Sequence, residues 1–290
     1  MFKVFSGKTI TIASAFLCIF LLLGSFINVS VPGIAASVKS GVTVPIIMYH
    51  QICSNPAVLG DYAITPEMLR SDFEYMKKNN IHPVSFGQLS KYVATGEPLP
   101  ENPVVISFDD GERSFLTKVL PLLKEYNYPA NLNVVGSLVE LYSQNGETDD
   151  RYAYLNKDDI RLLALEPLVE MGYHSYNLHS LGNRRGMGRL YGESEADYEK
   201  LILEDLSLFK NLFTQLTNTS PTIAAYPYGI RNDKLQNILE ANKFTITLTC
   251  RESTNTLNVG DNLFELGRFN RPFNLSTSTF FGKIFKANIL

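Results

Sequence analysis

Strand-like apolar runs alternate with helix-like amphipathic segments along most of this 290-residue chain. The predicted strands are 44–50, 82–86, 102–108, 129–136, 222–229, 244–249 and 263–269. The predicted helices are 65–80, 86–96, 117–127, 156–172, 195–217 and 232–242. Pro167 is expected to bend or split the helix 156–172. Strands and helices that alternate with short connections predict a mainly parallel sheet or barrel with helices outside.

The composition is that of a globular protein, with 45% hydrophobic and 19% charged residues. A chain of this length can form one large α/β domain with a substantial core. The formal net charge of −3 gives no indication of nucleic-acid binding, so we expect no nucleic-acid partner.

The N-terminus differs from the rest of the chain. Lys3 and Lys8 are followed by a long apolar stretch, and the next charged residue is Lys39. A basic start followed by an apolar stretch predicts an export signal, and a stretch of this length can also remain as a membrane anchor. Positive charge at the start keeps the N-terminus cytoplasmic and places the rest outside, whereas a buried core helix is the alternative.

This pattern predicts three regions and a location. Residues 1–36 are a signal peptide or membrane anchor, with small residues that allow cleavage after Ala36. Residues 37–43 are a linker, and residues 44–290 are the folded domain. The protein is expected to be secreted or anchored to the outer face of the cell membrane.

The chain has three cysteines, and Cys18 lies inside the apolar stretch. Cys53 and Cys250 do not make a disulfide framework. Two unrelated buried thiols are expected, and the alternative is that the two cysteines pair. A metal site in this chain must therefore use histidine and carboxylate.

Two adjacent carboxylates, Asp109 and Asp110, follow a predicted strand in the sequence SFDDG. By itself this sequence predicts a turn, because Asp-Gly favours turns. His174 and His179 lie in the segment GYHSYNLHS. Two imidazoles and one carboxylate can bind a metal ion and leave its remaining coordination positions open for water. The second carboxylate could take a proton from that water. The alternative is that these histidines cap a strand or pack on the surface.

The segment AAYPYG at 224–229 ends another predicted strand. Pro227 and Gly229 favour a tight turn, whose backbone N–H can stabilise a developing oxyanion. Tyr226 and Tyr228 could line a groove for sugar rings. The alternative is the end of a core strand with surface tyrosines.

SFDDG, HSYNLH and AYPYG, in this order, resemble the motifs of polysaccharide deacetylases with the NodB homology domain, carbohydrate esterase family 4. The resemblance covers roughly residues 44–270. The segment IIMYHQI resembles the entry segment of the branch that includes poly-β-1,6-N-acetylglucosamine deacetylases. The resemblance implies a distorted (β/α) barrel of the NodB type. It also implies a hydrolase acting on the carbon–nitrogen bond of linear amides, which removes acetyl groups from an amino-sugar polymer.

The resemblance also implies roles for single residues. Asp109 matches the general base, and Asp110, His174 and His179 match the metal ligands. The backbone N–H of Tyr228 matches the oxyanion donor. The expected metal is zinc, and cobalt, manganese, iron or nickel suit the same ligands.

The chain departs from the family pattern at three places. The two histidines are separated by four residues, as in the poly-N-acetylglucosamine branch, instead of three. Ala225 stands where the family often has an arginine that orients the base. Arg268 stands where the family usually has a histidine that acts as general acid. We therefore hypothesise that Arg268 replaces the missing arginine beside Asp109, and the sequence identifies no general acid.

Further expectations concern the substrate and the assembly. His50 follows the first strand, where substrate contact and a structural role are both open, whereas His82 is expected to be structural. The basic cluster at 183–189 is expected to be a solvated loop. The expected partner is an extracellular amino-sugar polysaccharide, exopolysaccharide or peptidoglycan, bound by a monomer. The alternative function is a catalytically weak or inactive carbohydrate-binding or scaffold protein on the same fold.

Overall fold

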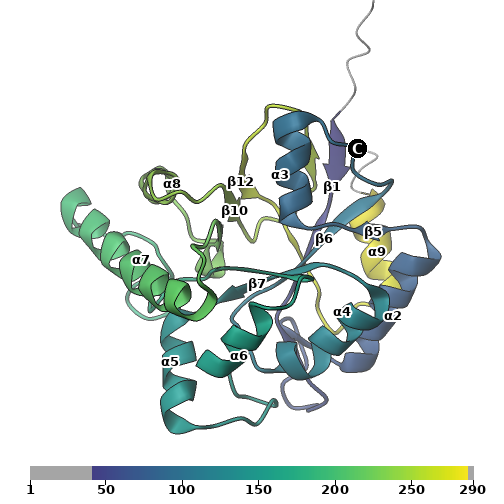
Figure 1. The fold of residues 1–290 in the computed structure, drawn as a ribbon, viewed down its shortest axis with the longest axis horizontal. Helices are drawn as coiled ribbons and strands as arrows, with labels where there is room; N and C mark the ends of the chain where they lie inside the picture. Colours follow the sequence, from purple (N-terminus) through teal and green to yellow (C-terminus); the bar gives the residue numbers. More distant parts are fainter. Residues whose placement is uncertain (1–40, 287–290) are drawn as a thin grey trace, which may run out of the picture. The chain divides into compact units, whose positions relative to one another are not determined.

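The structure is a computed structural model, and it describes residues 41–286. Its centre is a nine-stranded sheet in the order β12-β10-β9-β8-β7-β6-β2-β13, with β5 paired to β6 (Figure 1). Every pairing in this sheet is parallel. Its strands are β2 (Ile46–Tyr49), β5 (His82–Pro83), β6 (Pro103–Phe108), β7 (Ala130–Val134), β8 (Val169–Tyr173), β9 (Ile223–Ala225), β10 (Ile246–Leu248), β12 (Leu263–Leu266) and β13 (Phe269–Asn270). The predicted mainly parallel sheet is confirmed, and it is curled, with helices around it.

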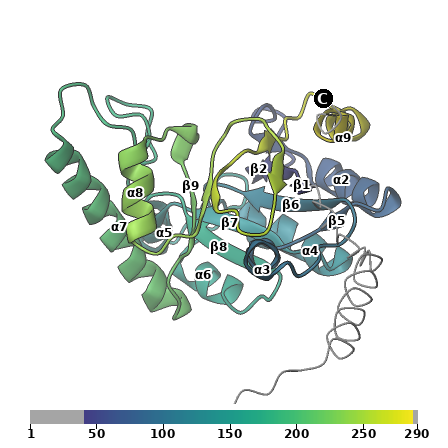
Figure 2. The same ribbon diagram turned by 90° about the horizontal axis from the view of Figure 1, so that it is seen from above.

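Helices follow most of the strands, as the right-handed crossover of parallel strands requires. They are α2 (Pro66–Lys78), α3 (Phe86–Thr95), the π-helical η1 (Phe115–Val119), α4 (Leu120–Tyr126), α5 (Gly136–Asn145), α6 (Lys157–Leu163), α7 (Glu195–Thr217), the 3₁₀ turn η2 (Pro227–Gly229), α8 (Asp233–Ala241) and α9 (Thr277–Lys286). Figure 2 shows α7 and α8 side by side at one end of the sheet and α2 and α9 together at the other.

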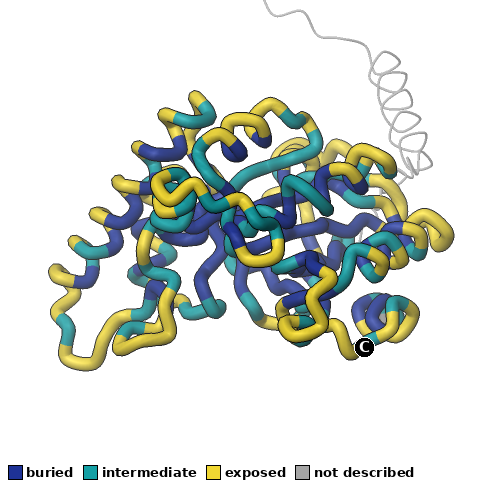
Figure 3. Tube along the Cα trace, turned by 90° about the horizontal axis from the view of Figure 1, so that it is seen from below, coloured by how far each residue is buried: buried dark blue, intermediate teal, exposed yellow. Residues whose placement is uncertain are grey.

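The core has two parts, because successive side chains of a strand point to opposite faces of the sheet. Ile47 and Ile106 belong to the larger cluster, which also contains the buried stripes of the outer helices. Ile46 and Val105 belong to a second cluster with Leu89 of α3. In Figure 3 the buried positions gather at the centre of the described chain and the exposed positions lie mainly on its periphery.

The predicted strand 263–269 is divided between the two ends of the sheet. Leu266 of β12 pairs with Leu248, whereas Phe269 of β13 pairs with Ile47 on the opposite edge. Two residues, Gly267 and Arg268, connect these strands. The prediction of a single strand was wrong, because the two halves of this segment pair with opposite edges of the sheet. The short connection between them brings these edges together.

The predicted helix 156–172 was wrong in its second half. α6 ends at Leu163, and Val169–Tyr173 forms β8 between β7 and β9. Pro167 lacks a backbone N–H and disfavours the helical conformation of the residue before it. The chain therefore leaves the helix and enters the sheet.

The remaining differences lie at strand ends and in short elements. The predicted strand 222–229 stops at Ala225, because Pro227–Gly229 forms the turn η2. Elements that the sequence analysis did not identify are α5, α9, the antiparallel pair β1 (Val42–Val44) and β11 (Asn255–Leu257), and the parallel pair β3 (Gln51–Ile52) and β4 (Ala63–Ile64).

The predicted export segment 1–36 and Cys18 lie outside the described residues. β1 begins at Val42, so the predicted linker 37–43 ends earlier than expected. The other predicted domain boundaries stay predictions. Cys53 and Cys250 are free thiols. Within residues 41–286, no helix combines the length and apolar character needed to span a membrane.

A buried ion pair connects α2 to the segment before α9. Arg271 Nε and Nη2 donate to the two carboxylate oxygens of Asp72 at 2.8 and 3.0 Å. Tyr49 and Thr277 donate their hydroxyls to the same carboxylate. Both charged side chains are fully buried, so each depends on the other for compensation.

We expect Asp72→Ala to lower the free energy of unfolding by about 3–5 kcal/mol, because it leaves the Arg271 charge buried and unpaired. Urea denaturation followed by circular dichroism measures this change. The matched control is Arg70→Ala on the same helix, which breaks an exposed pair with Glu125 and should change stability little. Equal effects of the two substitutions would contradict the proposed importance of the buried pair.

Candidate active site

The two carboxylates at the end of β6 point in different directions. Val105, Ser107 and Asp109 share the inner face of the sheet, because side chains alternate along the strand. Asp110 leaves the strand with a φ of +72°, in the left-handed region that non-glycine residues rarely adopt. One carboxylate therefore enters the interior while the other turns toward the rim.

Asp110, His174 and His179 form a cluster with metal-ligand geometry. Asp110 Oδ1 lies 3.3 Å from His174 Nε2 and 3.1 Å from His179 Nε2. Ligand atoms held at 2.0–2.2 Å around a tetrahedral zinc are about 3.4 Å apart, so this spacing suits a bound cation. Asp110 Oδ1 is buried and has no hydrogen-bond partner among the described residues, which also fits a ligand atom that faces a cation. The predicted ligand set comes together in space.

Each histidine is oriented through its second ring nitrogen. His174 Nδ1 lies 2.9 Å from the carbonyl oxygen of Ala225, and His179 Nδ1 lies 3.3 Å from the hydroxyl of Tyr228. A proton on Nδ1 can be donated to either oxygen, which leaves Nε2 unprotonated and directed at the shared position.

Asp205 of α7 holds the loop that carries these histidines. Its Oδ1 accepts from the hydroxyl of Tyr173 at 2.6 Å and from the backbone N–H of Tyr176 at 2.7 Å. Its Oδ2 accepts from the N–H of Asn177 at 2.7 Å. These bonds span Ser175, whose φ of +69° is unfavourable for a residue with a side chain. Asp205 thus stabilises the turn between the two histidines.

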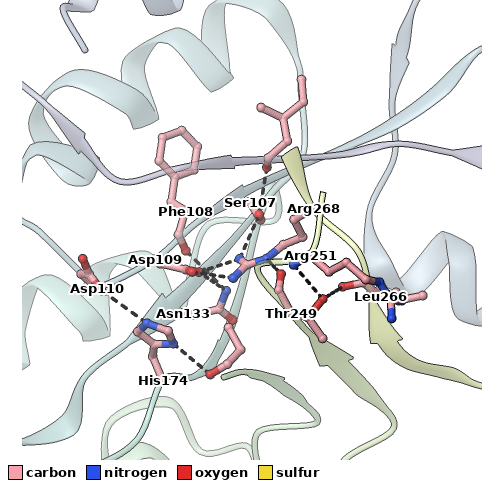
Figure 4. A network of polar contacts seen from close by, with 12 residues as sticks. Ser107, Phe108, Asp109, Asp110, Asn133, His174, Thr249, Arg251, Leu266 and Arg268 are labelled. Atoms are coloured by element: carbon pink, nitrogen blue, oxygen red, sulfur yellow. Dashed lines mark hydrogen bonds and ion pairs between the residues drawn. The ribbon is translucent and has the colours of Figure 1, made fainter. Parts of the chain in front are cut away.

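Arg268 and Asn133 bind the Asp109 carboxylate. Arg268 Nη1 donates to Oδ1 at 2.8 Å and Nη2 donates to Oδ2 at 2.6 Å, while Asn133 Nδ2 donates to Oδ1 at 2.8 Å (Figure 4). The hypothesised pairing of Arg268 with Asp109 is thus present. Oδ1 uses both lone pairs in these bonds, whereas Oδ2 keeps one, so Oδ2 is the oxygen that can accept from a water.

The electrostatic surroundings keep both aspartates ionised. Burial alone would raise the pKa of Asp109, but the Arg268 guanidinium and His174 hold it well below its usual range. Burial would also raise the pKa of Asp110, but the neighbouring imidazoles of His174, His179 and His50 outweigh that effect and hold it well below its usual range. Beside them, burial and the Asp110 charge raise the pKa of Glu112 to about 8.

The two tyrosines of AAYPYG have different positions. Tyr228 has a φ of +57°, and its ring centroid lies 4.7 Å from that of His179. Tyr226 is 0% exposed, and its hydroxyl donates to Oε1 of Gln236 on α8. The prediction that Tyr226 lines a substrate groove was therefore wrong, because its ring presents no surface to a sugar.

His50 follows β2 and faces the same rim. Its pKa is lowered by burial, while the charges of Asp110 and Asp109 act in the opposite direction. Its ring packs against Tyr62, with centroids 4.8 Å apart. His82 lies elsewhere, with Nδ1 at 2.6 Å from the carbonyl of Glu101.

In the basic cluster at 183–189, Arg184 forms an ion pair with Glu193. Part of the positive charge of that cluster is therefore neutralised within the loop itself.

Sequence reasoning did not identify Asn133, Asp205 or Glu112. Asn133 gave a signal, since Asn131 and Asn133 alternate with apolar residues in a buried strand beside Asp109. Asp205 gave another, since it interrupts the apolar stripe of α7. Glu112 gave none, because its burial depends on the folded loops around it.

We expect the full-length chain to bind one equivalent of zinc, and His174→Ala to lose it, because two ligands do not hold the cation. Inductively coupled plasma mass spectrometry after dialysis measures the content. His82→Ala is the matched control, and it should keep the metal. Stoichiometric zinc in the His174→Ala variant would contradict the assignment.

The chain is similar to characterised proteins over most of the described region. It is 29% identical over 206 residues to the poly-β-1,6-N-acetyl-D-glucosamine N-deacetylase of Escherichia coli (strain K12), an alignment of 64% of this chain and 30% of that protein. It is 23% identical over 208 residues to the protein of the same name from Staphylococcus aureus (strain N315), covering 72% of this chain and 68% of that one. The chain therefore spans about a third of the length of the Escherichia coli relative.

The fold and the sequence profile agree with these relatives. The structure matches a de-N-acetylase from Aggregatibacter actinomycetemcomitans with a TM-score of 0.71 and 24% identity, covering 82% of this chain and 98% of that one. Residues 96–247 match the profile of the family described as polysaccharide deacetylase, which is more than half of the chain. The chain belongs to the polysaccharide deacetylase family.

Proposed function

We propose that this protein is an exported, metal-dependent N-deacetylase of an extracellular N-acetylglucosamine polymer and acts as a monomer. One observation carries the proposal: a buried, ionised Asp109 lies directly beside a cluster of Asp110, His174 and His179 that suits a cation. Amide hydrolysis needs both an activated water and a group that accepts its proton.

The names of the relatives support the substrate class. The aligned proteins from Escherichia coli and Staphylococcus aureus are named as deacetylases of poly-β-1,6-N-acetyl-D-glucosamine. We therefore favour a β-1,6-linked exopolysaccharide over peptidoglycan as the substrate. Export is supported by the basic and apolar N-terminal sequence, as a cleaved signal or a retained anchor.

The chain's own residues divide the proposed reaction between them. When held by Asp110, His174 and His179, a divalent cation, zinc in the first place and cobalt, manganese, iron or nickel otherwise, would lower the pKa of the attacking water and polarise the acetyl carbonyl. Asp109 accepts the proton of that water at Oδ2 as the water oxygen bonds to the acetyl carbon. The N–H of Tyr228 donates to the carbonyl oxygen, which gains negative charge.

The leaving amine also needs a proton. We assign this proton to Asp109, which holds it after the attack and can pass it to the nitrogen as the carbon–nitrogen bond breaks. The products are acetate and a free amine, and no separate acid is required. Arg268 and Asn133 position Asp109 for both transfers.

The alternative function is a carbohydrate-binding or scaffold protein with little catalysis. A protein that only binds carbohydrate would not need an arginine that donates two hydrogen bonds to Asp109. It would also not need unprotonated Nε2 atoms of two histidines directed at Asp110. The complete ligand set and the paired base favour the enzyme.

We expect the full-length chain with zinc or cobalt to release acetate from N-acetylglucosamine oligomers, and faster from β-1,6 than from β-1,4 linkages. Asp109→Asn should lower kcat by at least about a hundredfold, because the amide cannot accept the proton. An enzyme-coupled acetate assay measures the rate.

The metal content separates the two roles of the pair. Asp109→Asn should retain zinc, whereas Asp110→Asn should lose both zinc and turnover. A folded, zinc-loaded wild-type chain that releases no acetate from either oligomer series would refute the deacetylase and favour the scaffold.

We expect Arg268→Met to move the acidic limb of the kcat/KM profile to higher pH. The reaction needs ionised Asp109, and Arg268 holds its pKa low against the effect of burial. Without Arg268 the pKa rises, so activity is lost earlier as the pH falls. Loss of an adjacent opposite charge corresponds to a shift of about one to three pH units.

Two further variants control for this shift. Arg268→Lys keeps the charge without the bidentate fork and should give a smaller shift. Arg251→Met removes an exposed arginine from a nearby segment and should leave the limb in place. An unchanged acidic limb in folded Arg268→Met would show that Arg268 does not tune Asp109.

A further inference from the structure

Gly172 of β8 lies beside a residue that holds the Asp109 carboxylate. β7 and β8 are parallel neighbours, and their register places Gly172 opposite Asn133. Asn133 is completely buried, and its Nδ2 donates to Asp109 Oδ1 at 2.8 Å (Figure 4). Gly172 is also buried, and it is the first residue of the segment GYHSYNLHS that carries the two histidines. A glycine therefore stands one side chain away from the proposed base.

The backbone conformation does not require a glycine at position 172. The φ of Gly172 lies outside the left-handed region, so a residue with a side chain could adopt the same conformation. Glycine inside a strand weakens the strand, because it has no side chain to pack. The reason for this glycine therefore lies in the space around its Cα.

A methyl group at position 172 would collide with Asn133. An ideally placed Cβ would lie 2.3 Å from Asn133 Oδ1, whereas real Cβ atoms essentially never approach another heavy atom within 3.0 Å. The same Cβ would lie 2.9 Å from the carbonyl oxygen of Ile223 on β9. Ile223 is held by the sheet, but the Asn133 amide is the end of a side chain. The amide is therefore the group that would move furthest.

The orientation of the Asn133 amide follows from its partners. Only the NH₂ end can donate to a carboxylate, so Nδ2 faces Asp109 and Oδ1 faces Gly172. Oδ1 is buried and has no hydrogen-bond partner among the described residues. A buried acceptor without a partner is unfavourable, so the hydrogen bond to Asp109 compensates for it. This orientation is possible only while position 172 carries no side chain.

We propose that Gly172 is a positioning residue for the reaction, because it leaves the space in which Asn133 can hold Asp109 Oδ1. This inference rests on the proposed function for the role of Asp109 as the base. With Oδ1 occupied by Asn133 and Arg268, Oδ2 stays directed at the attacking water. A side chain at position 172 displaces the amide and frees one side of the carboxylate, while every metal ligand remains.

Two substitutions and their combination test this inference on the full-length, zinc-loaded protein. Gly172→Ala and Asn133→Ala should each lower kcat by about tenfold to a hundredfold, the loss expected for one hydrogen bond to a charged group, with KM nearly unchanged. The double variant should be no slower than Asn133→Ala alone, because no amide is left to displace. An enzyme-coupled acetate assay with the β-1,6-linked N-acetylglucosamine hexamer measures the rates, and zinc content should stay at one equivalent.

Thermal unfolding makes the same comparison without reference to activity. Gly172→Ala should lower Tm more in the wild-type background than in the Asn133→Ala background, where its closest contact is absent. If Gly172→Ala alone does not fold, the double variant should still fold. Gly282→Ala in α9 is the control, since its added Cβ meets no atom of another segment within 4 Å, and it should lower neither kcat nor Tm.

The outcomes separate this inference from the proposed function. Equal losses of kcat and Tm from Gly172→Ala in both backgrounds would overturn the inference, because the contact with Ile223 would then account for them. Loss of zinc in Gly172→Ala would also overturn it, since the adjacent histidine loop would then have moved. A wild-type chain that releases no acetate would refute the deacetylase instead, while the Tm comparison still decides whether Gly172 makes room for Asn133.

Discussion

The ion pair between Arg268 and Asp109 depends on the closure of the curled sheet. The two residues are 159 positions apart, and each is almost completely buried. Arg268 lies in the two-residue connection between strands that pair with opposite edges of the sheet. Because a buried charge without a partner is costly, neither side chain tolerates the absence of the other. The same contact therefore holds the two sheet edges together and keeps Asp109 ionised.

Three residues close to this pair have an unfavourable backbone conformation. Asp110, Ser175 and Tyr228 all adopt positive φ, and they follow β6, β8 and β9 respectively. Such conformations cost on the order of 1–3 kcal/mol each and persist only where surrounding contacts enforce them. Asp205 supplies such contacts for the turn at Ser175. The strain has a consequence for the site, because it turns the side chains at the strand ends toward one another.

The site also accounts for the departures from the family motifs. Ala225 contributes no guanidinium, but its carbonyl orients His174, and the guanidinium arrives from Arg268 instead. Arg268 therefore occupies the motif position of a general acid, while its guanidinium forms an ion pair with Asp109. This exchange explains why the proposed mechanism gives both proton transfers to Asp109.

The amino-acid sequence was sufficient to predict the alternating strands and helices, both ends of the helix 195–217, and the Asp, His and Arg side chains around the site. These follow from local patterns, since periodicity, caps and motif order are properties of neighbouring residues. Three features became visible only in the folded chain: 169–173 is a strand, Tyr226 is buried, and Asn133 and Asp205 make hydrogen bonds that support the site. Each of these features depends on which distant segments of the chain pack against one another. Burial and contacts of this kind cannot be recognised from the pattern of neighbouring residues.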